Sequence, residues 1–224
     1  MAATSRTSPP VSSGSSGPLG SLGSLAESLQ PKLSLRERKK IKTRIAIRRA
    51  TYRLIAEQGY EATTVEQIAE TAEVSQSTVF RYFPTKEDIV LIDEFDPVMM
   101  EKLRARPTTE PPLESLRQVI TEAVRLALLH DREETVQRTR LMAEVPALRA
   151  RMMESMATTS RQLCEVLAER TGREAADLEL RVFAMATLGA LQETTVYWAE
   201  HAHTDDLPTL LNQTLNALEA GLPF

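Results

Sequence analysis

Residues 63 to 88, TTVEQIAETAEVSQSTVFRYFPTKED, contain two helix starts on either side of a very short joint. Thr64 and Gln67 have the T-x-x-Q spacing of a capping box, in which each side chain accepts a hydrogen bond from the other residue's backbone N–H. Ser75 is a favoured N-cap residue, so a second helix is expected to begin there and to end before Pro84. The joint between the two helices is only Glu-Val-Ser. Two short helices on so tight a turn are the signature of a helix-turn-helix motif.

The segment before this motif is strongly basic, although the whole chain carries a net charge of -4. Between Arg36 and Glu57 there are nine Lys or Arg residues and two acidic residues, a net charge of +7. Residues 92–224 hold 14 basic and 22 acidic residues, a net charge of -8. Charges farther apart than a Debye length of about 10 Å are largely screened. An acidic body therefore does not prevent a basic segment from binding a polyanion, and a solvated helix face is the alternative interpretation.

The second helix of the motif, QSTVFRYF, has two different faces. If Val79 points inward, Phe83 lies one turn later on the same side, and Ser77 and Arg81 point outward. The side chains then expected at the margins are Gln76, Thr78, Phe80 and Tyr82. Gln pairs with adenine edges, Ser and Thr bond to several bases, and an aromatic ring contacts the thymine methyl. These side chains predict a recognition helix in the major groove, with core packing as the alternative for the two aromatic residues at the margins.

Other residues are suited to hold the DNA backbone rather than to read bases. Lys86 lies in the first turn of the next helix, which Thr85 and Asp88 are expected to open as a second capping pair. Lysines and helix N-termini bind phosphates, which position a protein without reading sequence. The basic half of the preceding helix adds counterion release. The predicted DNA contacts are Arg44, Thr64, Ser75, Gln76, Ser77, Thr78, Phe80, Arg81, Tyr82 and Lys86.

Apolar periodicity near 3.6 residues predicts an all-α protein, and no strand pattern is found. Residues 1–33 form a Ser/Gly/Pro-rich tail that is expected to be disordered, because such a composition cannot offset its ordering entropy. Residues 34–90 are predicted to form a three-helix head with the helix-turn-helix, and residues 91–224 a larger helical body. Helices are expected at about 34–58, from 64 to the Glu-Val-Ser joint, and at 75–83, 85–106, 113–130, 132–144, 146–170, 174–200 and 207–220.

The stretch IAEQGYEATTVEQIAETAEVSQSTVFRYFPTKEDIV resembles the N-terminal DNA-binding domain of the tetracycline-repressor (TetR) family over about residues 44–90. The shared features are Gly59 followed by Tyr60, the I-A-x-x-A run, the VS before the recognition helix and the Y-F-x-x-K-E/D ending. Arg48 and Thr51 depart from the pattern, since the family more often carries Leu and Ala there. The resemblance implies a homodimeric transcription factor, usually a repressor, that leaves a palindromic double-stranded DNA operator when the body binds a small effector. It also implies that the last two helices pair the two chains.

The segment RTRLMAEVPALRARM, residues 138–152, resembles the branch of the family whose regulators bind acyl-CoA-like ligands. A small apolar effector is therefore expected, with an acyl-CoA as the candidate. Seven methionines lie in the body, and flexible thioethers suit a cavity for a long apolar ligand as well as they suit a core. The predicted ligand-binding residues are Phe95, Met99, Met100, Met142, Met153, Met156, Phe183, Gln192 and Trp198. For Phe183, Gln192, Tyr197 and Trp198, a place in the core or in the dimer interface is the alternative.

The sequence disfavours catalysis. It contains no G-x-S-x-G, no H-E-x-x-H, no P-loop and no glycine-rich dinucleotide turn, so no cofactor is expected. The His201-Ala-His203 pair beside Asp205 is not a zinc pattern by itself, so no metal is expected. Cys164 is the single cysteine and is interpreted as a small core residue. An enzyme would become the favoured interpretation if the protein turned over an acyl thioester. Two further alternatives are an activator and a helical interaction protein that has lost DNA binding.

The chain is expected to act in the cytoplasm without a membrane partner. Its apolar runs are far shorter than the roughly 20 residues needed to cross a bilayer. The N-terminus lacks the charged and apolar regions of a secretory signal, and a single cysteine fits a reducing compartment.

Overall fold

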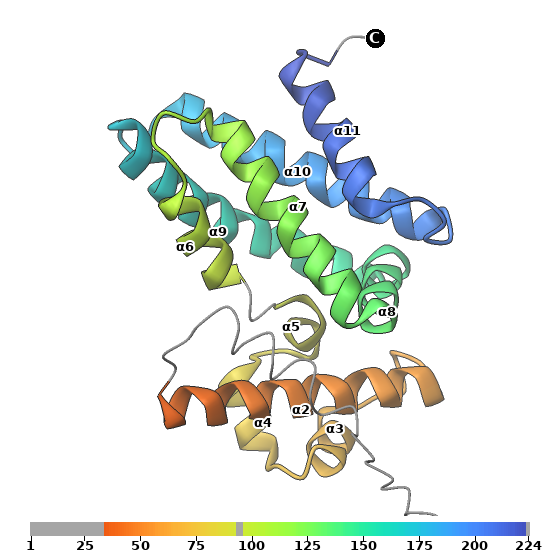
Figure 1. Ribbon diagram of the computed structural model, residues 1–224. Helices are drawn as coiled ribbons and strands as arrows, with labels where there is room; N and C mark the ends of the chain where they lie inside the picture. The colour runs from red at the N-terminus through yellow and green to blue at the C-terminus, as the bar shows by residue number, and fades with distance from the viewer. Residues whose placement is uncertain (1–33, 93–95, 223–224) are drawn as a thin grey trace, which may run out of the picture.

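The computed structural model describes residues 34–92 and 96–222, and every regular element in this part of the chain is an α-helix (Figure 1). The helices are α2 (Leu35–Gln58), α3 (Val65–Thr71), α4 (Gln76–Tyr82), α5 (Lys86–Leu91), α6 (Asp96–Ala105), α7 (Pro112–His130), α8 (Arg132–Glu144), α9 (Pro146–Thr171), α10 (Leu178–Glu200) and α11 (Leu207–Glu219). The predicted all-α fold is confirmed. The predicted tail and the predicted ligand contact Phe95 lie outside the described residues.

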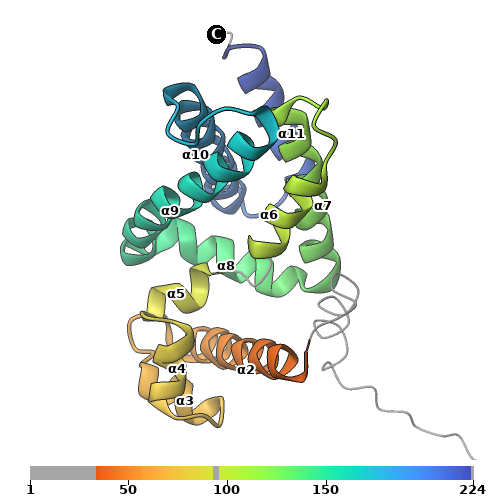
Figure 2. The ribbon, with the colours of Figure 1, turned by 90° about the vertical axis from the view of Figure 1, so that its left-hand side faces the viewer.

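The head is formed by α2, α3 and α4 around one apolar cluster. Ile47 of α2, Ile68 of α3, Val79 of α4, Phe83 at its C-cap and Ile89 of α5 are fully buried and pack together. Burying a side chain of this size stabilises the fold by about 1.5–3 kcal/mol. The cluster therefore holds three short helices that would be marginal alone. Both ribbon views place α3 on the side of α2 that faces away from the body (Figures 1 and 2).

The short helices of the head begin at their predicted capping residues. Thr64 accepts a hydrogen bond from the backbone N–H of Gln67, and the Gln67 side chain accepts one from the backbone of Thr64 at 2.9 Å. Thr85 and Asp88 make the same reciprocal pair at the start of α5. Ser75 caps α4 through a hydrogen bond from the third residue of that helix. Each such cap contributes about 1 kcal/mol, which fixes where these helices start.

The predicted single helix over residues 85–106 is wrong. The chain forms two helices there: α5 ends at Leu91, Ile92 is extended with φ -74° and ψ 124°, and α6 starts at Asp96. Pro97 explains the break, because proline has no N–H to donate within a continuous helix. It is tolerated only in a first turn, so the helix restarts around it. A smaller difference is that α10 begins at Leu178 rather than near residue 174.

The body, α6 to α11, is organised around two apolar clusters. The first lies between α6, α7, α9 and α10 and includes Leu103, Leu163 and Ala184. The second joins α10 to α11 and α7 around Trp198 and Leu211. Figures 1 and 2 show α8 on the side of the body nearest the head, with α5 between the body and the head. No helix of the described residues is long and apolar enough to span a bilayer.

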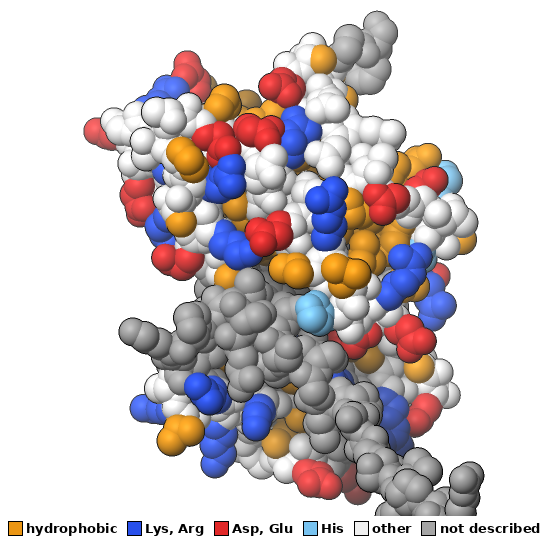
Figure 3. Space-filling view, in the orientation of Figure 1, with side chains coloured by type: hydrophobic (Ala, Val, Ile, Leu, Met, Phe, Trp, Pro, Cys, Tyr) orange, Lys and Arg blue, Asp and Glu red, His pale blue; other side chains and the backbone are white. Residues whose placement is uncertain are grey.

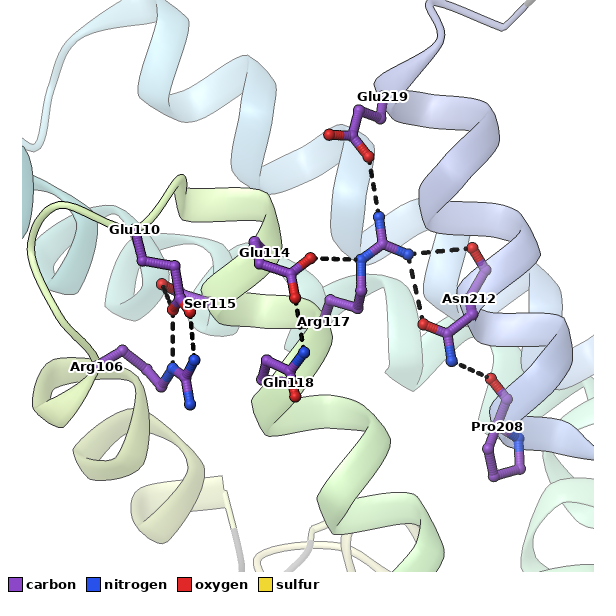
Figure 4. Close-up of polar contacts among 9 residues, drawn as sticks. All are labelled: Arg106, Glu110, Glu114, Ser115, Arg117, Gln118, Pro208, Asn212 and Glu219. Atoms are coloured by element: carbon purple, nitrogen blue, oxygen red, sulfur yellow. Dashed lines mark hydrogen bonds and ion pairs between the residues drawn. The ribbon is translucent and has the colours of Figure 1, made fainter.

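Arginines hold the start of α7 in place (Figure 4). Arg117 is almost buried and ties α7 to α11, with its guanidinium 2.8 Å from Glu114 Oε2 and 3.1 Å from Glu219 Oε2. Arg106 pairs with Glu110 in the preceding loop. Hydrogen bonds from Arg106 and then from a nearby serine lower the pKa of Glu110 to about 2. The loop between α6 and α7 is thus fixed by charge rather than by apolar contacts.

Candidate nucleic-acid interface

The helix α4 presents a polar, exposed edge on a rigid apolar base. Val79 and Phe83 are both 0 % exposed and face the head cluster. Ser77 and Arg81 are exposed on the opposite side, as the helical spacing predicts. Gln76 is exposed as well. Because Val79 and Phe83 are fixed in the core, the exposed side chains of α4 have fixed positions on the surface of the head.

The two aromatic residues of α4 have different environments. Phe80 is 49 % exposed, so its alternative place in the core is wrong. Tyr82 is half-buried and packs against the head cluster. The guanidinium carbon of Arg81 lies 5.2 Å from the centre of the Tyr82 ring. Phe80 therefore offers an apolar surface for a thymine methyl, while Tyr82 supports the helix and its charged neighbour.

A cluster of hydroxyl groups forms the start of α4. The Ser75 hydroxyl lies 2.9 Å from the hydroxyl of Ser77 and 2.9 Å from that of Thr78. It also accepts a hydrogen bond from the backbone N–H of Thr78 at 3.2 Å. A hydroxyl both donates and accepts, so these contacts fix the positions of two predicted base-reading groups. In this geometry Ser75 supports the two hydroxyl groups that are predicted to read bases.

Lys86 is tied to the loop between α2 and α3. Its Nζ donates to the carbonyl oxygens of Tyr60 at 2.9 Å and of Thr63 at 3.1 Å, and lies 4.0 Å from the centre of the Tyr60 ring. An ammonium has three N–H donors, so one is left for a phosphate. The contact to Thr63 also places Lys86 next to the exposed N-cap Thr64. Lys86, a predicted phosphate contact, therefore also fixes the loop that contains Thr64, another predicted DNA contact.

Tyr60 and Glu87 form a hydrogen bond that the sequence did not predict. The Tyr60 hydroxyl donates to Glu87 Oε1 at 2.6 Å. Burial and then this carboxylate raise the pKa of Tyr60. Burial acts to raise the pKa of Glu87 too, but the hydrogen bond from Tyr60 helps to bring it below its usual value. The loop before α3 is thus fixed from both Lys86 and Glu87, two adjacent residues of α5.

The basic half of α2 supplies the positive charge near this edge. The side chains of Arg36, Lys39, Lys40 and Lys42 are exposed. Figure 3 shows Lys and Arg side chains gathered on the lower left of the head. Arg44 is half-buried instead, with its guanidinium carbon 5.5 Å from the centre of the Phe83 ring.

The predicted ligand residues of the body do not form one group. Met99, Met100 and Phe183 are half-buried and pack against the first body cluster. Trp198 is fully buried in the second cluster, where its Nε1 donates to the backbone oxygen of Asp205 at 2.8 Å. The remaining three methionines differ in exposure, with Met153 59 % exposed and Met142 and Met156 half-buried. Gln192 is half-buried on α10.

Comparisons with known proteins agree with this arrangement. Residues 47–91 match the family described as "Bacterial regulatory proteins, tetR family", and residues 110–223 match the "MftR C-terminal domain". The chain is 32 % identical over 183 residues to the HTH-type transcriptional regulator TcmR of Streptomyces glaucescens, covering 76 % of this chain and 79 % of that protein. It is 27 % identical over 181 residues to the fatty acid metabolism regulator protein of Bacillus subtilis (strain 168), covering 77 % and 92 %.

A solved structure shows the same fold. The fatty acid degradation regulator FadR from Bacillus halodurans superposes with a TM-score of 0.54 at 24 % identity, covering 80 % of this chain and 98 % of that one. The matched families and relatives are regulators rather than enzymes, which confirms the prediction made from the missing catalytic motifs. The chain belongs to the TetR family of transcriptional regulators.

Proposed function

We propose that this regulator is a homodimeric repressor, acting in the cytoplasm, that binds a palindromic operator and leaves it when a small apolar effector occupies the body. The observation that carries the proposal is the exposed edge of α4. Gln76, Ser77 and the 49 % exposed Phe80 stand over the buried Val79 and Phe83. These side chains have the chemistry to read base edges in a major groove, and the exposed lysines and arginines of α2 supply affinity for phosphates.

An apolar stripe on α10 supports the dimer. Leu178, Val182 and Met185 are 73 %, 57 % and 42 % exposed, and they recur at helical spacing along one face. Contiguous exposed apolar side chains mark an interaction surface more often than isolated ones do. A second copy of the same helix is the occupant expected of a two-fold interface. Two recognition helices would then lie about 34–36 Å apart, one turn of DNA.

The effector is proposed to be a long apolar molecule, with a fatty acyl-CoA as the candidate. Met99 and Met100 of α6 and Phe183 of α10 are half-buried and pack against the first body cluster, and thioethers adapt readily to an apolar ligand. The relative from Bacillus subtilis is named for fatty acid metabolism. The ligand would act only through a difference in its affinity for the two head arrangements.

The experiment that tests the proposal is a footprint of the protein on the DNA upstream of its own gene. A protected region with a dyad is expected, and the affinity should fall steeply between low and moderate salt because phosphate contacts release counterions. Acyl-CoAs of increasing chain length are then titrated against the labelled complex. Protection without a dyad, or affinity insensitive to salt, would refute the DNA-binding proposal. No release or tightening at any chain length would refute the acyl-CoA.

A further inference from the structure

The covalent connection between head and body is not a rigid rod. The short helix α5 ends at Leu91, and Ile92 is in an extended conformation before α6 begins. A displacement of α6 is therefore not carried into the head by a continuous helix. Other contacts must fix the orientation of the head relative to the body. One is a buried apolar cluster that joins Tyr52, Ile55, Tyr60 and Val90 to Leu141 of α8 and Leu148 of α9, and the others are polar.

Side chains of the body form hydrogen bonds with α5 at both of its ends. Arg151 of α9 places its Nε 2.8 Å from Asp88 Oδ1 and a second nitrogen 3.2 Å from Oδ2. Asp88 is 1 % exposed and lies in the first turn of α5. Arg138 of α8 donates to the carbonyl oxygen of Leu91, in the last turn, at 2.7 Å. Since α5 also contributes Ile89 to the head cluster, it is shared between the two parts.

A second contact joins α8 directly to α2 of the head and does not involve the side chains of α5. Arg48 of α2 is 8 % exposed and donates to the backbone oxygens of Ile89 at 3.4 Å and of Ile92. Its remaining terminal nitrogen lies 3.9 Å from Glu134 Oε1 on α8. One turn along α8, Gln137 donates to the backbone oxygen of Tyr52 at 2.9 Å.

Arg48 is one of the two residues that depart from the family pattern, and these contacts give it a role. Glu134 supplies one of the contacts that compensate this buried guanidinium, and a buried charge is costly to keep without such contacts. A shift of α8 that lengthens this contact is thus unfavourable unless α2 moves with it, together with the motif packed on α2. Figures 1 and 2 show α8 directly beside this part of the head.

We propose that Glu134 is a positioning residue, and that its pair with Arg48 sets the orientation of the head and so transmits a displacement of α8 to the DNA-reading edge. The link to DNA affinity rests on the proposed function, whereas the orientation itself is a property of one chain. Glu134 acts through Arg48 and α2, and it is not one of the predicted DNA contacts.

The test compares Glu134→Gln with Glu144→Gln. Both changes remove one carboxylate charge from α8, and Glu144 also has an arginine partner at 3.9 Å, but that pair is exposed and lies within the helix. Spin labels are placed at Glu70→Cys on α3 and Gln162→Cys on α9, both exposed, in a Cys164→Ala background. Labelled chains are diluted with unlabelled protein, so the measured distance is that between head and body in one chain.

Glu134→Gln is expected to broaden or shift this distance distribution and to lower operator affinity by about 5-fold or more, the scale of coupling between sites. Glu144→Gln should change neither quantity. The double variant Glu134→Gln/Gln137→Ala should enlarge both effects.

Three outcomes would overturn the proposal: a distribution that matches that of Glu144→Gln, an affinity change without a change in distance, or an effect that follows a large drop in melting temperature. If the unmodified protein protects no dyad, the proposed function fails, and the distance measurement still decides whether Glu134 orients the head.

Discussion

The head and the body are each stabilised internally by different kinds of contact. In the head, a seven-residue helix, α4, is fixed by a cap and by side chains that enter one apolar cluster. In the body, α9 and α10 run for 26 and 23 residues. A buried arginine of α9, Arg170, donates to the backbone oxygens of Leu103 and Arg106 and to the Ser115 hydroxyl. The head thus combines local caps with one apolar cluster, whereas the body also relies on a buried arginine that bonds to residues 55 to 67 positions away.

Because of this difference, the two parts place different constraints on their side chains. The head must hold a few side chains at fixed positions, so its caps and its apolar base are tightly constrained. The body contains half-buried methionines, and the ion pair between Arg106 and Glu110 fixes the loop before α7. The joint between them combines both kinds of contact, since α5 is capped locally at Thr85 and gripped from far along the chain by Arg138 and Arg151.

The largest expected effect comes from the apolar base of the head. Phe83→Ala should lower the free energy of unfolding by about 3–5 kcal/mol, because a fully buried ring leaves a cavity. The matched control is Phe80→Ala, which removes the same ring from a 49 % exposed position and should cost about 0.5 kcal/mol or less. Phe80→Ala should nevertheless weaken operator binding.

Denaturant unfolding and a gel shift measure the two quantities. Equal losses of stability in the two variants would contradict the division of α4 into a base and a reading edge.

The next effect concerns the exposed stripe on α10. Val182→Asp should raise the dissociation constant of the dimer by about 100-fold, because two like charges would face each other across a two-fold axis. Gln118→Asp on the exposed face of α7 is the control and should leave association unchanged. Sedimentation velocity over a range of concentrations measures both. A dimer that survives Val182→Asp would place the interface elsewhere.

Much of the head could be predicted from the sequence because its signals are local. Thr64 with Gln67, Ser75, and Thr85 with Asp88 each fix a helix start through contacts three residues away. The orientation of α4 followed from one assumption about Val79.

The contacts that the sequence did not predict join residues far apart in the chain. The bond between Tyr60 and Glu87 spans 27 residues, and Arg48 reaches backbone groups 41 and 44 residues away. No spacing rule predicts such contacts. The departure of Arg48 from the family pattern was the one available signal. The break before α6 also had a signal, since Pro97 stands where a continuous helix would need an N–H donor.

Within the reading edge, base readers and backbone anchors should respond differently. Gln76→Ala is expected to relax base preference at particular operator positions by about 1–3 kcal/mol. Lys86→Ala should weaken binding to all sequences alike and reduce the salt slope by about one unit. Competition against a library of operator variants at several salt concentrations separates the two. A larger change of sequence preference in Lys86→Ala would show that its hold on Tyr60 and Thr63 matters more than a phosphate contact.

The smallest effect tests whether the polar loop of the body contributes to stability. The pKa of Glu110 is lowered to about 2 by its hydrogen bonds to Arg106 and Ser115, and the usual glutamate value is about 4.3. A carboxyl whose pKa is lowered on folding stabilises the protein above its unfolded pKa, and that contribution disappears as the pH falls through the folded value. Glu110→Gln should therefore melt at a slightly lower temperature than the unmodified protein at pH 7, and this gap should narrow below about pH 4. The pair is partly exposed, so the gap should also shrink in high salt. A gap that stays constant from pH 7 to pH 3 would mean that the side chain acts by its shape and not by its charge.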